Sequence, residues 1–474
     1  MKFILTGLLC ILFTNLYAQS NLYSLSDLSS VHLRSLEKEI QSEWTCPNEY
    51  ADKKVQKSFC EMWQSRSEYL ARGIRSDDFI NQKSISSLLD NISTEIYNNN
   101  KDRLKQKPRM LIDRSPVVNA YSIGNNIVVV NLGLINFCNY EEELALVVAH
   151  EISHDLLSHS VNSMKQKAEW VNSQEYKNFI KDLEQDKYNR LTKVVKTFKE
   201  YSYSRSKHGR FGETSADSLA ALLLLNTRYK FNAEYFLRLD SSDLEYKTPL
   251  KKNIPEYFSV YNLSINPTLL EKRGKGLSAK QVSFNSSSTL EDSLKTHPDC
   301  IERFNNLKHI STTSAPKTPI DPAIKNLATK AMIWNLYKNG NLTASMYRLL
   351  LMVDNGQSDT WTDFMATNIL ISLYIEDVML NRSNAINIKQ KEYIGKDYYA
   401  LQNYFEQISP DDLEILKNEV MKFSVQFPSK DEGNFRRALK EVSADPNKFK
   451  YANKKYKKEL FTGLEDNIYG EYFN

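Results

Sequence analysis

The spacing of apolar residues divides the chain into helical stretches on either side of one short β-rich segment. Residues 20–105 are polar, with apolar positions at helical intervals in segments such as Ile85 to Tyr97. Farther along, the runs VVNAYSI and IVVVN flank a Gly-Asn-Asn sequence at 124–126. Two β-rich runs around such a turn predict a hairpin. The fold class that follows is mainly α with a small β-sheet.

Two apolar helices are predicted after the hairpin. Asn139 as N-cap with Glu142 three residues later has the form of a capping box, so the first helix should begin at about Tyr140. The second begins near Gly212, in the run GETSADSLAALLLLN. The charged stretch from residue 163 to 199 lies between them and is consistent with a helical hairpin packed over the site that these helices would form.

The N-terminus has the layout of a secretory signal peptide. Lys2 precedes an apolar run from Phe3 to Leu12, and the segment closes on Ala18 before polar residues begin. This run is short for a membrane span, and no later stretch approaches the roughly 20 apolar residues that a spanning helix needs. We therefore expect cleavage near Ala18 and a secreted protein, periplasmic in a Gram-negative-type cell.

Composition and charge are those of an ordinary globular protein, with 41% hydrophobic and 25% charged residues. A formal net charge of +4 on 474 residues creates no strong single-sign field, so no nucleic-acid partner is expected. The densest basic run spans Lys448 to Lys458. A solvated helix face is favoured there over a contact with an anionic membrane.

Four cysteines remain after the leader: Cys46, Cys60, Cys138 and Cys300. They allow three disulfide connectivities. A Cys46–Cys60 bridge would close a short local loop, and a Cys138–Cys300 bridge would join distant parts of the chain. Buried thiols are the alternative. None shows the C-x-x-C spacing of a cysteine-based zinc site.

The run VVAHEISHDLLSH carries the clearest chemical signal. His150 and His154 are four residues apart, so both imidazoles lie on one face of a helix with Glu151 beside them. Two neutral histidines can bind one zinc ion, and a catalytic zinc takes a third protein ligand and keeps one position open. Glu151 would take a proton from water at that position. The alternative is a pair of structural histidines, but burying these groups without a metal would be costly.

The third ligand is expected on the downstream helix. Glu213 lies near its start and Asp217 one turn later on the same face. A carboxylate ligand, with a second carboxylate that accepts the ring N–H of a ligand histidine, is typical of such sites. The alternative is an acidic helix N-terminus stabilised by the helix dipole. His159, five residues past His154, is expected to support a ligand or to pack.

Four motifs occur in order along residues 110–310: VVNAYSIGNNIVVVNLGLI, ELALVVAHEISH, GETSADSLA and THPDCIERF. Together they resemble the gluzincin peptidases of the CAAX prenyl protease, HtpX and BepA type. The resemblance implies a zincin-like α+β metallopeptidase core with one Zn²⁺ per chain. It matches the family's zinc ligands to His150, His154 and Glu213, its catalytic glutamate to Glu151, and its helix carboxylate to Asp217.

The same resemblance implies further roles. Asn119, Ala120 and Tyr121 match the edge strand along which family members pair an extended substrate. His297, before Pro298, and Arg303 match an element near the zinc, so both are candidate catalytic residues. His297 is an extra ligand, an oxyanion stabiliser or an ordinary loop histidine, and Tyr121 and Arg303 are the other candidates for holding the oxyanion.

We therefore expect four parts: a signal peptide over 1–18, an N-terminal helical region over 19–105, a zinc metallopeptidase domain over 106–315, and a helical C-terminal domain over 316–474. The last part shows no clean fixed period, so a repeat architecture is one possibility.

The expected function is that of a zinc-dependent endopeptidase outside the cytoplasm, acting on polypeptides such as misfolded or misassembled envelope proteins. Because no spanning helices are expected, prenylated substrates are not implied. The C-terminal helices would bind envelope protein partners. The alternative is a latched or inactive protease core that acts as a helical chaperone or scaffold.

Overall fold

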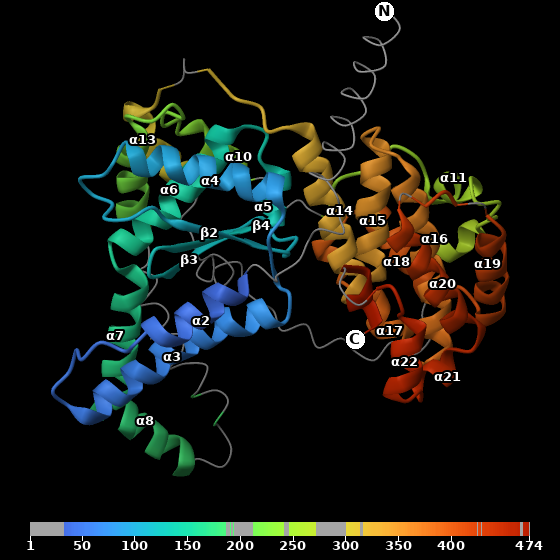
Figure 1. Cartoon of the computed structure of the whole chain (residues 1–474), viewed down its shortest axis with the longest axis horizontal. Coiled ribbons are helices and arrows are strands. Elements are labelled where there is room, and N and C mark those ends of the chain that lie inside the picture. Colours follow the sequence, from blue (N-terminus) through green and yellow to red (C-terminus); the bar gives the residue numbers. More distant parts are fainter. Residues whose placement is uncertain are drawn as a thin grey trace, which may run out of the picture.

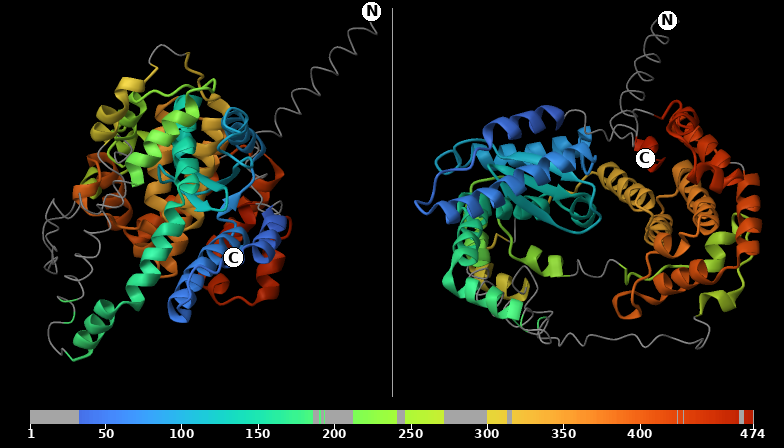
Figure 2. Two further views of the ribbon diagram at one scale, coloured as in Figure 1. Left: turned by 90° about the vertical axis from the view of Figure 1, so that its left-hand side faces the viewer. Right: turned by 90° about the horizontal axis from the view of Figure 1, so that it is seen from below.

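The computed structural model describes residues 33–185, 190, 193, 212–240, 246–271, 300–312, 316–423, 425–427, 429–464 and 468–473. Figure 1 shows two parts, which lie side by side also in the right-hand view of Figure 2. The sheet lobe comprises the described residues of 33–240 and 300–320, and the helical lobe those of 246–271 and 321–473. The expectation of a mainly helical protein with one small β-sheet is confirmed.

The sheet has four strands in the order β1-β2-β4-β3. Their bounds are Phe79–Ile80 for β1, Arg109–Asp113 for β2, Ala120–Gly124 for β3 and Ile127–Asn131 for β4. Strands β2 and β4 are parallel, whereas β3 and β4 form the predicted hairpin, with Tyr121 opposite Val129. The turn residues Asn125 and Asn126 have φ values of 51° and 62°, a conformation that asparagine tolerates. Strand β3 is therefore an edge of the sheet.

Side-chain alternation along β4 explains why this strand is buried on both faces. Val128 and Val130 face the core under α4 (Lys83–Asn98) and α6 (Glu141–Leu156). Ile127 and Val129 face the opposite core, formed with α2 (Arg34–Glu43) and α3 (Lys53–Arg75). Figure 1 shows these helix pairs on either side of the sheet. The sheet thus becomes a rigid central layer.

The start of α6 differs from the predicted cap by one residue. Tyr140 is the N-cap, and the carboxylate of Glu143 accepts hydrogen bonds from the backbone N–H groups of Asn139, at 2.6 Å, and Tyr140, at 3.4 Å. Glu142 instead accepts the backbone N–H of Thr318 at 2.9 Å. The reciprocal cap therefore uses Glu143, because the helix begins one residue later than the Asn139 assignment required.

The described part of the charged stretch after α6 does not fold back over α6. It forms α7 (His159–Asn172) and α8 (Gln174–Gln185), and Figure 1 shows both helices leading away from the sheet. Helix α7 packs on α3, where Phe59 and Trp63 enclose Ala168. This arrangement extends the sheet lobe along α3.

A disulfide joins Cys46 to Cys60 and so ties the segment after α2 to the second turn of α3. The second expected bridge, from Cys138 to Cys300, is not formed, and Cys138 is a buried thiol. The local pairing follows from proximity, since the two cysteines are 14 residues apart.

The helical lobe is organised around α16. Its helices are α14 (Pro322–Lys338), α15 (Leu342–Asp354), α16 (Thr360–Val378), α17 (Arg382–Ile386), α18 (Lys396–Gln407), α19 (Pro410–Lys422), α20 (Lys430–Ala444), α21 (Pro446–Lys450) and α22 (Lys454–Leu460). Helix α16 is buried on nearly every side and contacts α15, α17, α19, α20 and α21. In a stack of repeats each helix pair contacts only its neighbours, so this packing is that of a bundle. Of the helices that the structure describes, none combines the length and apolarity required to cross a membrane.

Residues 246–271 lie with the helical lobe although they precede α13 (Cys300–Leu307) of the sheet lobe. Their elements are α11 (Ile254–Ser259) and η4 (Pro267–Leu270). Tyr257 donates its hydroxyl to Asp354 of α15 at 2.5 Å, and Tyr261 donates to Asp363 of α16 at 3.0 Å. Residues 246–271 therefore belong to the helical lobe although they lie in the sequence between two elements of the sheet lobe, α10 (Glu234–Leu239) and α13.

The two lobes meet where α5 (Leu132–Phe137) packs on α14. Asn136 of α5 donates a hydrogen bond to Thr329 of α14. Gly133 of α5 lets the backbone of residues 116–117 pass close, because a Cβ atom at this position would overlap the carbonyl group of Pro116. Within the sheet lobe, the absence of a side chain at Gly133 thus lets α5 lie against the segment that precedes β3.

We predict that Gly133→Ala destabilises the protein by about 1–3 kcal/mol, because the added methyl group must displace backbone rather than a flexible side chain. Gly433→Ala in α20 is the matched control, since its Cβ would meet Phe427 at an ordinary 3.7 Å and alanine favours a helix. Urea unfolding monitored by circular dichroism gives both values. Equal effects of the two substitutions would contradict the close approach at Gly133.

Candidate metal centre

Two histidines on α6 converge at one point beside the sheet. The Nε2 atoms of His150 and His154 lie 3.0 Å apart, as expected for residues one turn apart on the same face of a helix. His150 is only 4% exposed, because α6 packs on the sheet through its apolar side. The two ring nitrogens therefore share one small, largely dry space.

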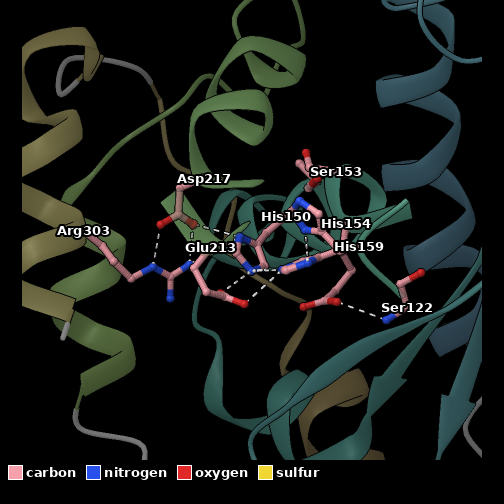
Figure 3. Close-up of polar contacts among 10 residues, drawn as sticks. Ser122, His150, Ser153, His154, His159, Glu213, Asp217 and Arg303 are labelled. Carbon is pink, nitrogen blue, oxygen red and sulfur yellow. Dashed lines mark hydrogen bonds and ion pairs between the residues drawn. The ribbon is translucent and has the colours of Figure 1, made fainter. Parts of the chain in front are cut away.

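Glu213 reaches the same point from the helix over residues 212–224. Its Oε2 lies 3.3 Å from Nε2 of His150, and its Oε1 lies 3.4 Å from Nε2 of His154. The three residues form a group that could hold a metal ion. Zinc bonds of ~2.0–2.1 Å in tetrahedral geometry place ligand atoms ~3.3 Å apart, so these separations fit a zinc ion. Figure 3 shows the three side chains pointing toward one another.

Asp217 fixes the orientation of the His150 ring. Its Oδ1 lies 2.8 Å from Nδ1 of His150, so Nδ1 carries the hydrogen and Nε2 keeps the lone pair that a metal requires. Arg303 of α13 binds the same carboxylate through two hydrogen bonds of 2.8 and 2.6 Å, and its guanidinium lies 4.3 Å from the centre of the Phe236 ring. Three elements are thereby joined through one buried carboxylate.

The electrostatics of this cluster favour positive charge at His150. Burial lowers the pKa of its imidazole, but the hydrogen bonds to Asp217 and Glu213 outweigh burial and raise the pKa to about 9. Burial likewise raises the pKa of Asp217, yet its contacts with His150 and Arg303 hold that pKa below its usual range. The carboxylates therefore stabilise a cation here, either a proton or a metal ion.

His159, the first residue of α7, contacts the other histidine of the pair. Nδ1 of His159 lies 2.8 Å from Nδ1 of His154, so one of these nitrogens must donate to the other. For His154 to offer a lone pair at Nε2, its Nδ1 donates and His159 accepts. His159 packs on Gly212, the residue directly before Glu213. This contact brings the helix over residues 212–224 against the start of α7.

Glu151 lies on the side of α6 that faces the edge strand. Its Oε2 accepts the backbone N–H of Ser122 in β3 at 3.0 Å, and the residue is 6% exposed. One turn later, Asp155 accepts the backbone N–H of Asn126 at 2.6 Å. The hairpin and α6 are therefore joined by two hydrogen bonds, and Glu151, which follows His150 in α6, is bonded to the edge strand.

The residues expected to bind substrate lie on or beside this edge, but their side chains diverge. Ala120 is buried in the core on the α6 side, and Asn119 directly precedes β3 and is exposed. Tyr121 packs toward α2 and α3, where its hydroxyl donates to Asp113 at 2.9 Å. Because successive strand residues point to opposite faces, the Tyr121 side chain lies on the face of the sheet away from α6, and its role in holding an oxyanion stays a prediction.

Of the two predicted catalytic residues near the family motif, Arg303 lies beside the site and His297 lies outside the described residues. The guanidinium of Arg303 is taken up by Asp217, and its Nη2 lies 3.4 Å from Nδ1 of His150, on the side of the ring away from the metal-binding nitrogen. Arg303 is therefore placed to position His150 rather than to contact a reacting atom.

The contact between Ser122 and Glu151 was not foreseen from the sequence. The donor is a backbone N–H group, so the residue type at position 122 does not predict this contact. Only the packing of β3 against α6 brings the two together.

Residues 85–311 match the model of peptidase family M48. A search of curated proteins finds no significant match to the chain.

We predict that Asp217→Asn weakens Zn²⁺ binding by about 10–100-fold, because the amide removes the charge that orients His150 and that offsets the buried Arg303. Competition with a fluorescent zinc chelator measures the affinity. Asp411→Asn, at an exposed position of α19, is the control. An unchanged affinity in a folded Asp217→Asn protein would show that Asp217 has no part in holding the metal.

Proposed function

Residues 85–311 belong to peptidase family M48, which makes the chain a metallopeptidase, and on this premise we propose that it is a secreted zinc-dependent endopeptidase that cleaves extended polypeptides. The observation that carries the proposal is the convergence of His150, His154 and Glu213 beside Glu151 at an open sheet edge. The alternative of an inactive core is not favoured, because a group that could hold a metal ion lies beside a carboxylate that could act as the base.

The edge strand β3 is the proposed substrate-binding element. The N–H of Asn131 in β4 donates to the carbonyl of Asn119, and the antiparallel register then directs every second residue of β3 toward β4. Ala120 and Ser122 consequently turn their backbone groups away from β4, toward the open edge. The N–H of Ser122 is donated to Glu151, so an extended chain can pair with the backbone groups of Ala120 and with the carbonyl of Ser122. Such β-augmentation fixes the path of the substrate without selecting its side chains.

His150, His154 and Glu213 would hold the zinc ion. When bound, it would supply Lewis-acid chemistry, polarising a peptide carbonyl and acidifying water. Glu151 is the proposed general base, which accepts a proton from water and passes it to the leaving amine. The Ser122 N–H holds this carboxylate against the edge where a substrate backbone would lie, so the base is already positioned beside the bond to be cleaved.

The second set of residues acts through the ligands. Asp217 fixes the His150 tautomer, Arg303 holds Asp217, and His159 accepts the ring hydrogen of His154. These contacts come from three separate helices, so they also fix the distance between Glu213 and the two histidines. We assign Asp217, Arg303 and His159 as positioning residues.

The leader-like N-terminus supports action outside the cytoplasm, in a periplasm-like compartment. The Cys46–Cys60 disulfide fits the same location, since disulfides persist in oxidising compartments. Misfolded envelope proteins are the proposed substrates, because an edge strand pairs with exposed backbone and folded proteins expose little of it. The helical lobe is proposed as the surface that binds partner proteins.

We predict that Glu151→Gln retains zinc but lowers the rate of casein cleavage by at least about 10³-fold, because glutamine cannot accept the proton. Glu213→Ala should lose both zinc and cleavage, since it removes a ligand. Metal analysis and a fluorogenic casein assay, each with and without chelator, separate the two effects. Cleavage retained by Glu151→Gln would contradict the assignment of Glu151 as the base. Cleavage that a chelator does not inhibit would contradict the metallopeptidase mechanism.

We also predict that protein recovered from a periplasmic fraction begins at Gln19 and contains the Cys46–Cys60 bridge. Intact-mass and peptide mass spectrometry, with alkylation before and after reduction, identify both features. Cys138 should react with the alkylating agent only after unfolding, because its thiol is buried. Recovery of chains that retain residues 1–18 would contradict the signal peptide.

A further inference from the structure

A cavity of about 610 Å³ lies between the two lobes. The sheet lobe contributes residues 116–118 and α5, and the helical lobe contributes α14, α15 and residues 248–251. No role in metal binding or in the chemistry above involves this cavity. Its position at the junction of the lobes is one where ligand sites commonly occur.

Positive charge predominates in its lining. Lys251, Lys325 and Arg348 contribute three cations, and Asp354 contributes a carboxylate. That carboxylate already accepts hydrogen bonds from the backbone N–H of Lys251, at 2.9 Å, and from the hydroxyl of Tyr257. The cavity thus presents an excess of positive charge to whatever enters it.

The lysines contact neutral oxygens. Lys251 donates its ammonium group to the backbone carbonyl of Asp354 at 2.5 Å, and Lys325 donates to Oδ1 of Asn139 at 2.8 Å. Burial lowers the pKa of Lys325, so an anion placed beside it would stabilise its charged form. Arg348 donates to the carbonyl of Pro116, which aims a third cation at the segment that leads into β3.

The cavity lies beside the segment that leads into the edge strand. Pro116 and Val118 line it, and β3 begins at Ala120, two residues after Val118. Ser122, which faces Glu151, is six residues from Pro116, so an extended chain on β3 reaches the cavity within ~20 Å at ~3.3 Å per residue. A substrate that follows the edge away from Glu151 is therefore long enough to reach these cations.

We propose that the cavity between the lobes is a binding subsite for acidic side chains of the polypeptide substrate, about four to six residues from the cleaved bond. The proposal rests on the proposed function, because it takes the substrate to lie along β3. It also gives the helical lobe a direct part in substrate selection, since α14, α15 and residues 248–251 supply all three cations.

The test is a binding measurement with the full-length Glu151→Gln protein, which separates binding from cleavage. The probes are two pairs of fluorescein-labelled 16-residue peptides. In the first pair, one peptide carries four Glu residues at its N-terminal end and the other carries four Gln residues there. The second pair carries the same residues at the C-terminal end. For one of the two ends, we expect the Glu peptide to bind about tenfold more tightly by fluorescence anisotropy, as two or three partly exposed ion pairs would give.

The triple variant Lys251→Gln, Lys325→Gln and Arg348→Gln removes the three cations of the lining. It should bring the ratio of the affinities for the Glu and Gln peptides close to one and leave the affinity for the Gln peptide unchanged. Lys251→Gln alone, at an exposed position, should lower the ratio about twofold without risk to the core. The matched control is Lys454→Gln, Lys455→Gln and Lys458→Gln, which removes the same charge from the exposed surface of α22.

A ratio near one for both ends in the Glu151→Gln protein, or an equal loss of the ratio in the control, would overturn the subsite. Casein cleavage by the parent enzyme is measured in parallel. Absent cleavage with a retained binding preference would refute the proposed peptidase function and leave the subsite standing, so the two failures are distinguishable.

Discussion

The buried contact of Asp217 with His150 and Arg303 is the interaction on which the site depends. It connects α6, the helix over residues 212–224 and α13, three elements that are distant in the sequence. Removing a carboxylate and a guanidinium from water costs several kcal/mol per ion, so such a pair is a poor source of stability. Its value is positional. It sets the His150 tautomer and holds Glu213, one turn from Asp217, at coordinating distance from both histidines.

A second constraint joins α6 to the sheet edge. Glu151 and Asp155, one turn apart on α6, accept the backbone N–H groups of Ser122 and Asn126. Because both contacts are made to the same hairpin, α6 cannot slide or rotate without breaking one of them. The proposed base, the histidine nitrogens that could hold a metal and the edge strand therefore belong to one unit, which is what a reaction between a held substrate and a held water requires.

The parts of this arrangement that the sequence predicted are those with a local signature. The hairpin follows from two β-rich runs around 124–126, and the pair His150 and His154 from helical spacing. The predicted cap of α6 used Glu142, whereas the observed cap uses Glu143, because the two neighbouring glutamates fit the same sequence pattern. The Ser122 contact had no signature, since a backbone donor is the same in every residue type. The direction of the Tyr121 side chain required knowing which face of β3 carries α6.

The relation between the lobes was the hardest feature to predict, because it depends on contacts made across long sequence separations. Residues 246–271 fall within the segment that matches the peptidase family, yet Tyr257 and Tyr261 are bonded to helices α15 and α16. The family segment thus extends into the helical lobe and returns to the site at α13, where Arg303 holds Asp217. A helical lobe attached only by a linker could move freely relative to the edge strand. Here the two attachments, with the packing of α5 on α14, hold the helical lobe beside the segment that leads into β3, where the proposed substrate path runs.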